Sequence, residues 1–119
     1  MTPEACNAFC AALPAATHVV QWGGADVWKV GAKVFAIAGR GDDNHLSISF
    51  KVTPLVFEIY RDHSDCRPAP YLASRGMSWI QYYQGDTLSD DDLKGLIIDS
   101  HRLVAAGLPR KTQKELGLI

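Results

Sequence analysis

Residues 46–54 read Leu-Ser-Ile-Ser-Phe-Lys-Val-Thr-Pro, and this stretch decides the fold. From Leu46 to Val52 apolar side chains alternate with Ser and Lys, which is the pattern of a strand with one buried and one solvent-facing side. Thr53 and Pro54 then provide a helix cap and a first-turn proline, so a helix is expected directly after the strand. A helical apolar face follows, made of Leu55, Val56, Ile59 and Tyr60.

On the N-terminal side of this strand, short β-type runs are separated by glycine-rich breaks. We expect strands over residues 17–22, 27–30 and 33–38, followed by a loop over 39–44. Strands so close in sequence usually pair antiparallel, which predicts a meander. Before them, Thr2-Pro3-Glu4 is typical of a helix start. The apolar face of that first helix is Cys6, Phe9, Cys10 and Leu13.

On the C-terminal side, a connector over residues 63–76 leads to an expected strand over 77–84. Ser89 followed by Asp92 is a capping box, and we expect a helix from there to Gly107. A basic tail follows, with a last turn of helix. The order helix, several strands, helix, strand, helix predicts an α+β fold, in which an antiparallel sheet has helices packed on one side as a two-layer sandwich. We expect residues 1–119 to form a single domain.

Charge and composition limit the classes of function. The formal net charge is −1, so binding to nucleic acid would need a local basic face. The N-terminus lacks a basic region followed by an apolar run, and no apolar stretch reaches the length of a membrane span, so no membrane partner is expected. Three cysteines are an odd number that fits no disulfide framework, which favours a cytoplasmic location.

Residues that could carry catalysis or hold a metal are sparse. His63 and Cys66 have the spacing of two zinc ligands or of a base and a nucleophile, but no second pair and no orienting group accompany them. Acidic side chains that could attract iron lie in expected loops and at a helix start, where aspartate is common anyway. These are Asp42, Asp43, Asp86, Asp90, Asp91 and Asp92. The sequence therefore assigns no catalytic residue, no metal site and no cofactor.

Basic and aromatic residues form the most coherent set. Residues 86–100 hold five acids and one lysine, whereas residues 67–85 hold two arginines and no acid, so the charge is segregated. Basic side chains can hold phosphates, and aromatic rings can stack on bases or wedge between them. The alternative is that the rings belong to the core and the charges only aid solubility. The candidate DNA-contacting residues are Lys29, Lys33, Lys51, Arg67, Arg75, Tyr71 and Trp79.

Three stretches taken together make the chain similar to the MmcQ/YjbR family (DUF419). They are residues 47–54, the run His-Ser-Asp-Cys-Arg-Pro-Ala-Pro-Tyr-Leu at 63–72, and Trp79-Ile80 with the helix start at 88–90. The resemblance covers the whole chain. It implies a frataxin-like (CyaY-like) α+β fold and a DNA-binding role through a "double wing" of helices and strands. The family positions are Lys51, Ser64, Asp65, Arg67, Pro68, Tyr71, Leu72 and Trp79.

Residues 73–78, Ala-Ser-Arg-Gly-Met-Ser, depart from that family, which usually has more polar or basic residues and often a histidine just before the tryptophan. Three functions therefore stay open. The first is a bacterial, cytoplasmic, non-catalytic DNA-binding protein. The second is a module that binds a small ligand or a protein in a polar pocket of Ser64, Asp65 and Arg67. The third, iron binding of the frataxin type, is disfavoured because the first helix holds a single acid, Glu4.

Overall fold

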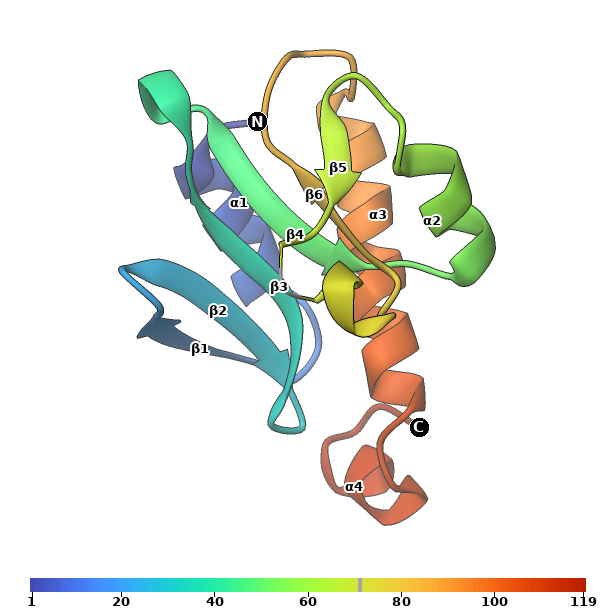
Figure 1. Cartoon of the computed structure of the whole chain (residues 1–119). Coiled ribbons are helices and arrows are strands. Elements are labelled where there is room, and N and C mark those ends of the chain that lie inside the picture. The colour runs from blue at the N-terminus through green and yellow to red at the C-terminus, as the bar shows by residue number, and fades with distance from the viewer. Residues whose placement is uncertain (71) are drawn as a thin grey trace.

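The computed structural model describes residues 1–70 and 72–119, which form one six-stranded antiparallel sheet and four α-helices (Figure 1). The strand order is β1-β2-β3-β4-β6-β5. The predicted α+β class is confirmed. The helices are α1 (Pro3–Ala11), α2 (Pro54–Tyr60), α3 (Asp90–Ala106) and α4 (Arg110–Glu115). The strands are β1 (Ala16–Gln21), β2 (Ala25–Val30), β3 (Lys33–Arg40), β4 (Leu46–Lys51), β5 (Cys66–Pro68) and β6 (Trp79–Tyr82).

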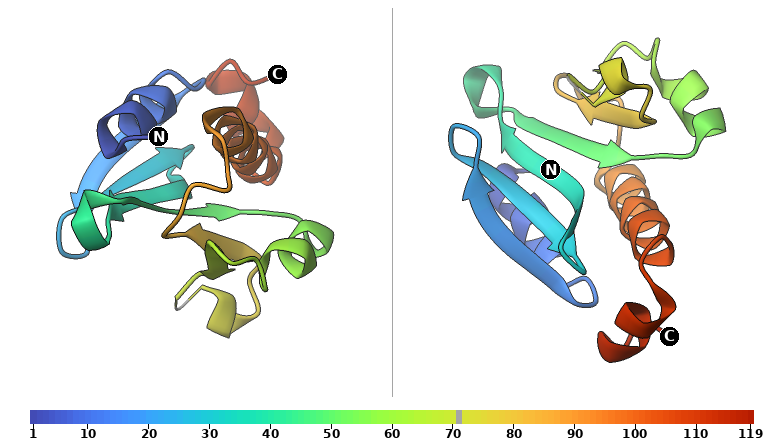
Figure 2. Two further views of the ribbon diagram at one scale, coloured as in Figure 1. Left: turned by 90° about the horizontal axis from the view of Figure 1, so that it is seen from above. Right: turned by 60° about the horizontal axis from the view of Figure 1, so that its bottom comes forward.

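Helices α1 and α3 cover one face of the sheet (Figure 2). Helix α1 packs on β1, β2 and β3, and α3 packs mainly on β3 and β4, whereas α2 contacts β5 and β6 at the far edge of the sheet. The core lies between the sheet and the two covering helices. Its largest fully buried side chains include Phe35, Leu46, Ile48, Phe50, Ile80, Leu93 and Ile97.

Helix starts follow the predicted capping chemistry. The hydroxyl of Thr2 accepts the N–H of Ala5 at 3.0 Å, and Pro3 occupies the first turn. At the start of α3, Ser89 and Asp92 exchange side-chain-to-backbone hydrogen bonds of 3.0 and 3.1 Å. These caps satisfy N–H groups that a helix cannot pair internally, which explains why both boundaries could be located from sequence.

Strand register divides the sheet residues between two faces. Phe50 pairs with Ile80, and both point toward the helices; their neighbours Lys51 and Trp79 are also paired and therefore point to the opposite side. We call that opposite side the helix-free face. Its strand positions are Thr17, Val19, Gln21, Ala25, Val27, Lys29, Val34, Ile37, Gly39, Ser47, Ser49, Lys51, Arg67, Trp79 and Gln81.

Residues 66–68 correct the sequence interpretation, because they form the edge strand β5 and not part of a connector. Three residues are too few for an alternation pattern, and Pro68 argues against a strand except at a sheet edge, where β5 lies. The connector that remains holds a 3₁₀ turn, η2, over Ala73–Arg75. Strand β3 also extends to Arg40, two residues into the expected loop. Tyr71 lies outside the described residues.

Candidate nucleic-acid interface

Three predicted contact residues meet on the helix-free face, although they are far apart in the chain. Lys51 is the last residue of β4 and stands opposite Trp79, the first residue of β6. Arg67, in the middle of β5, stands opposite Gln81, two residues further along β6. Antiparallel pairing on both sides of β6 is what brings Lys51, Trp79 and Arg67 onto one surface.

Arg67 is an exposed cation with an ordered side chain. Its guanidinium lies over the ring of Tyr83, 4.2 Å from the centroid, and its Nε donates to Gln81 Oε1 at 2.7 Å. The cation–π stack on Tyr83 and the hydrogen bond from Nε to Gln81 fix the orientation of the guanidinium group. Its outer N–H groups make no hydrogen bond within the described residues, so they are placed to bind an oxyanion.

The lysines of this face are not neutralised nearby. Lys29 and Lys51 are half-buried, and within the described part of the chain neither forms an ion pair. Lys33 is exposed and also forms no ion pair there, but it pairs with Val30 and is not a strand position of this face. No strand position of the helix-free face carries a carboxylate. Arg75 adds an exposed positive charge in η2, on the segment that joins β5 to β6.

Two carboxylates near α1 have partners on the helix-covered side of the sheet. Glu4 of α1 pairs with Arg40. Asp26 accepts from His18 at 2.7 Å and from Asn7 at 2.9 Å, and the hydrogen bond from His18 is the main reason that the pKa of Asp26 is lowered. These two carboxylates lie on the side of α1 and not on the helix-free face.

Asp65 and Arg67 do not form the predicted polar clamp. The Asp65 carboxylate accepts the backbone N–H of Thr87 at 3.1 Å and also the Thr87 hydroxyl, and these two bonds lower its pKa. Ser64 contributes only its backbone carbonyl, which accepts from Gln84 at 2.6 Å. Arg67 has separate partners in Gln81 and Tyr83, so Asp65 and Ser64 anchor the loop before α3.

Trp79 is 3% exposed and therefore cannot stack on a base in this conformation, which corrects that prediction. Its indole Nε1–H is buried and has no acceptor among the described residues. A buried donor left without an acceptor costs about 1–3 kcal/mol, so this group needs an explanation.

Trp22 is the aromatic residue that the sequence interpretation missed as a contact candidate. It lies in the turn between β1 and β2, is 66% exposed and has a φ of +49°, an uncommon backbone conformation for a bulky residue. The following Gly23-Gly24 was the available signal, because two glycines after an aromatic residue mark the tip of a hairpin.

His63 and Cys66 do not form a nucleophilic pair. Burial raises the pKa of the Cys66 thiol to about 12, so the thiol stays protonated at neutral pH. The His63 Nδ1 accepts a hydrogen bond from the backbone N–H of Asp65 at 3.1 Å, which stabilises the turn there. Within residues 1–70 and 72–119, no three His, Cys, Asp or Glu side chains are grouped closely enough to hold a metal ion.

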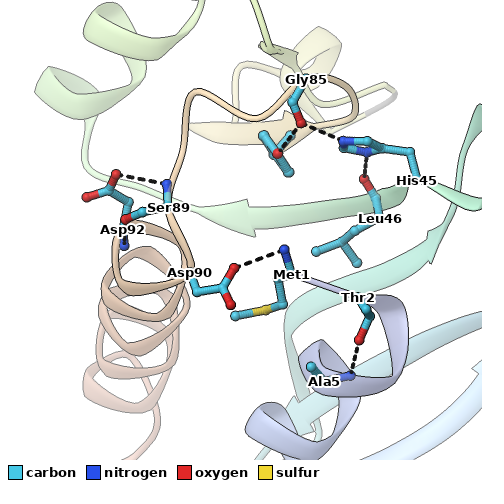
Figure 3. A network of polar contacts seen from close by, with 10 residues as sticks. Met1, Thr2, Ala5, His45, Leu46, Gly85, Ser89, Asp90 and Asp92 are labelled. Carbon is cyan, nitrogen blue, oxygen red and sulfur yellow. Dashed lines mark hydrogen bonds and ion pairs between the residues drawn. The ribbon is translucent and has the colours of Figure 1, made fainter.

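A separate polar cluster fixes the loop that precedes α3 (Figure 3). His45 Nδ1 lies 2.6 Å from the Leu46 carbonyl and His45 Nε2 lies 2.7 Å from the Gly85 carbonyl, which Tyr82 also contacts through its hydroxyl at 2.7 Å. The N-terminal amino group pairs with Asp90 at 2.9 Å beside this cluster. The contact of His45 with Gly85 and the ion pair of Met1 with Asp90 join distant segments of the chain, so we regard this cluster as structural.

Comparison with known proteins agrees with the fold. The YjbR family model matches residues 11–103. Deinococcus radiodurans protein DR2400, which has a DUF419 domain, superimposes with a TM-score of 0.82 at 25% identity, covering 98% of this chain and 88% of that one. A Pseudomonas syringae protein superimposes with a TM-score of 0.70 at 18% identity, covering 87% of this chain and 99% of that one.

No curated protein matches the sequence, and no helix in the described part of the chain is long and apolar enough to cross a membrane. The family match spans more than half of the chain, and the structural neighbour with a DUF419 domain has the same fold. The chain belongs to the YjbR family.

Proposed function

We propose that this protein binds DNA, without catalysis, through the helix-free face of its sheet. The observation that carries this proposal is the charge of that face: Lys29, Lys51 and Arg67 lie on it, and its strand positions hold no carboxylate. Phosphate attraction supplies most of the affinity of proteins for DNA, and it requires such a local basic surface when the whole chain is near neutral. The role implies a cytoplasmic location.

The contacts divide by chemistry. Lys29, Lys51 and Arg67 bind phosphate oxygens, and Arg75 in η2 extends the same surface. The β1–β2 hairpin acts as one wing, whose tip presents the exposed ring of Trp22 to a base or to the minor groove. A net charge of −1 means that distant acids repel DNA, so we expect modest affinity that falls steeply with salt.

The test is fluorescence anisotropy of a labelled duplex, titrated with protein over a salt series. Three phosphate contacts predict a slope of log K against log salt of about −3, from about −0.9 per contact. Arg67→Ala should weaken binding to all sequences similarly and reduce the magnitude of the slope by about 1.

Lys94→Ala is the matched control, because Lys94 lies on α3 with its ammonium 5.7 Å from the centre of the Phe9 ring, on the helix-covered side. It removes the same charge and should leave the slope unchanged. Absence of binding at low salt would refute the proposal. An equal loss of slope in both variants would show that net charge matters and the helix-free face does not.

A further inference from the structure

A cavity of about 400 Å³ lies at the end of the sheet where β4 stops while β3 continues. The last β3–β4 pair is Ala36 with Phe50, so residues 33–35 of β3 extend beyond β4. The C-terminal part of α3 and the segment around η2 complete the walls. The lining residues given by β3, β4 and β6 are Lys33, Val34, Ile37, Lys51 and Trp79, and those given by other segments are Trp22, Leu72, Met77, Leu103, Val104 and Gly107.

The walls are mostly apolar, and all polar side-chain groups among them are hydrogen-bond donors. Lys33 and Lys51 each bring an ammonium group, neither forms an ion pair among the described residues, and the lining contains no carboxylate. Trp79 adds a buried indole N–H that has no acceptor there. Every polar side chain of the lining is thus a donor or a cation, and the missing partner is an acceptor with negative charge.

We propose that this cavity binds a small amphipathic carboxylate, a free molecule with an alkyl chain or one ring attached to one carboxylate group. The volume is in the range of small-molecule sites, about 300–1,000 Å³, and such sites combine apolar walls with a few placed polar groups. The apolar body lies against Ile37, Leu72 and Leu103. The carboxylate lies between the ammonium groups of Lys33 and Lys51, and the indole N–H of Trp79 donates to it once the ligand has entered beside the ring.

Two other ligand classes fit less well. A neutral lipid or alcohol would bury apolar surface but would leave both ammonium groups and the indole N–H without an acceptor. A nucleotide has several charges and sugar hydroxyls that the leucine, isoleucine and valine walls cannot bond. Charge and apolar surface together therefore select a singly charged amphipath.

The experiment is a titration of ¹⁵N-labelled full-length protein with octanoate below its micelle-forming concentration, followed by two-dimensional NMR. We expect saturable binding with a shift of the Trp79 indole N–H signal, which Trp79→Phe identifies by its disappearance. Octanol, with the same chain and no charge, should bind at least tenfold more weakly. This titration contains no nucleic acid, so failure to bind octanoate would not refute the DNA-binding proposal. Equally, failure to bind DNA would not refute binding of a carboxylate in this cavity.

Lys51→Gln separates binding in this cavity from general adsorption. It keeps the stem of the side chain and removes the charge, so octanoate affinity should fall about tenfold while octanol affinity stays unchanged. Lys94→Gln, on the other side of the sheet, should leave both affinities unchanged. Equal affinity for octanoate and octanol, no saturation, or saturation without any shift at Trp79 would each overturn the assignment.

Discussion

At the scale of single residues, Ser100 bonds two backbone groups of the sheet, a role that no sequence motif indicates. It is fully buried on α3, and its hydroxyl donates to the Phe35 carbonyl at 2.6 Å and accepts the Lys51 N–H at 2.8 Å. The two backbone groups belong to β3 and β4 at the point where the strands part. The side chain therefore replaces a ladder bond that the sheet cannot make there.

Ser100→Ala should lower the free energy of unfolding by about 1–3 kcal/mol, because both backbone groups lose their buried partner. Urea denaturation monitored by circular dichroism measures this. Gly95→Ala on the same helix is the contrasting variant: an added Cβ meets nothing within 4 Å, so stability should rise by about 0.5–1 kcal/mol. A neutral Ser100→Ala would show that water replaces the hydroxyl.

Asp65 gives the stability a dependence on acid pH. Its pKa is lowered in the folded state by the hydrogen bonds from Thr87, so its contribution is fully present above the ordinary pKa of an aspartate and is lost as the pH falls through the lowered value. Asp65→Asn should reduce stability at neutral pH and flatten the acid limb of the curve. Urea midpoints at neutral and acid pH compare the two proteins; parallel curves would contradict this role.

At the scale of elements, predictability followed the strength of the local signal. Strand β4 and the starts of α1, α2 and α3 could be located because alternation and capping are local patterns. Strand β5 could not, since its three residues are held by pairing with β6 and not by their own propensity. The candidate site divided in the same way. The sequence found the cations, but strand register decides that Lys51 and Arg67 share a face. The binding of Asp65 to Thr87 and the burial of Trp79 depend on long-range packing that no local pattern shows.

The tip of the β1–β2 hairpin is expected to contact DNA through Trp22. If the Trp22 ring stacks on a base, an oligonucleotide should shield it from acrylamide, while Trp28 and Trp79 are already buried. Tryptophan quenching with and without DNA measures the effect. Trp22→Phe should remove the quenchable component without loss of folding. Equal quenching in both conditions would exclude the tip of this hairpin from the contact.

At the scale of the whole molecule, the two sides of the sheet differ in how their charges are paired. Helices α1 and α3 cover one side, where Glu4 and Asp26 are paired, and the other side keeps its cations without partners among the described residues. A near-zero net charge therefore coexists with an uneven distribution, in which those cations lie on the helix-free face. Such a distribution orients a protein as it approaches a polyanion, and this effect weakens once salt shortens the screening length.

The same two-layer packing encloses all three cysteines, Cys6, Cys10 and Cys66, as free thiols. A reagent that modifies thiols can reach them only when the layers separate, so its rate of reaction reports how often the native molecule opens. The rate of thiol modification therefore measures the opening equilibrium of the native protein. The same rate, measured in buffer without denaturant and without an added label, should report the stability changes of the Ser100, Gly95 and Asp65 variants.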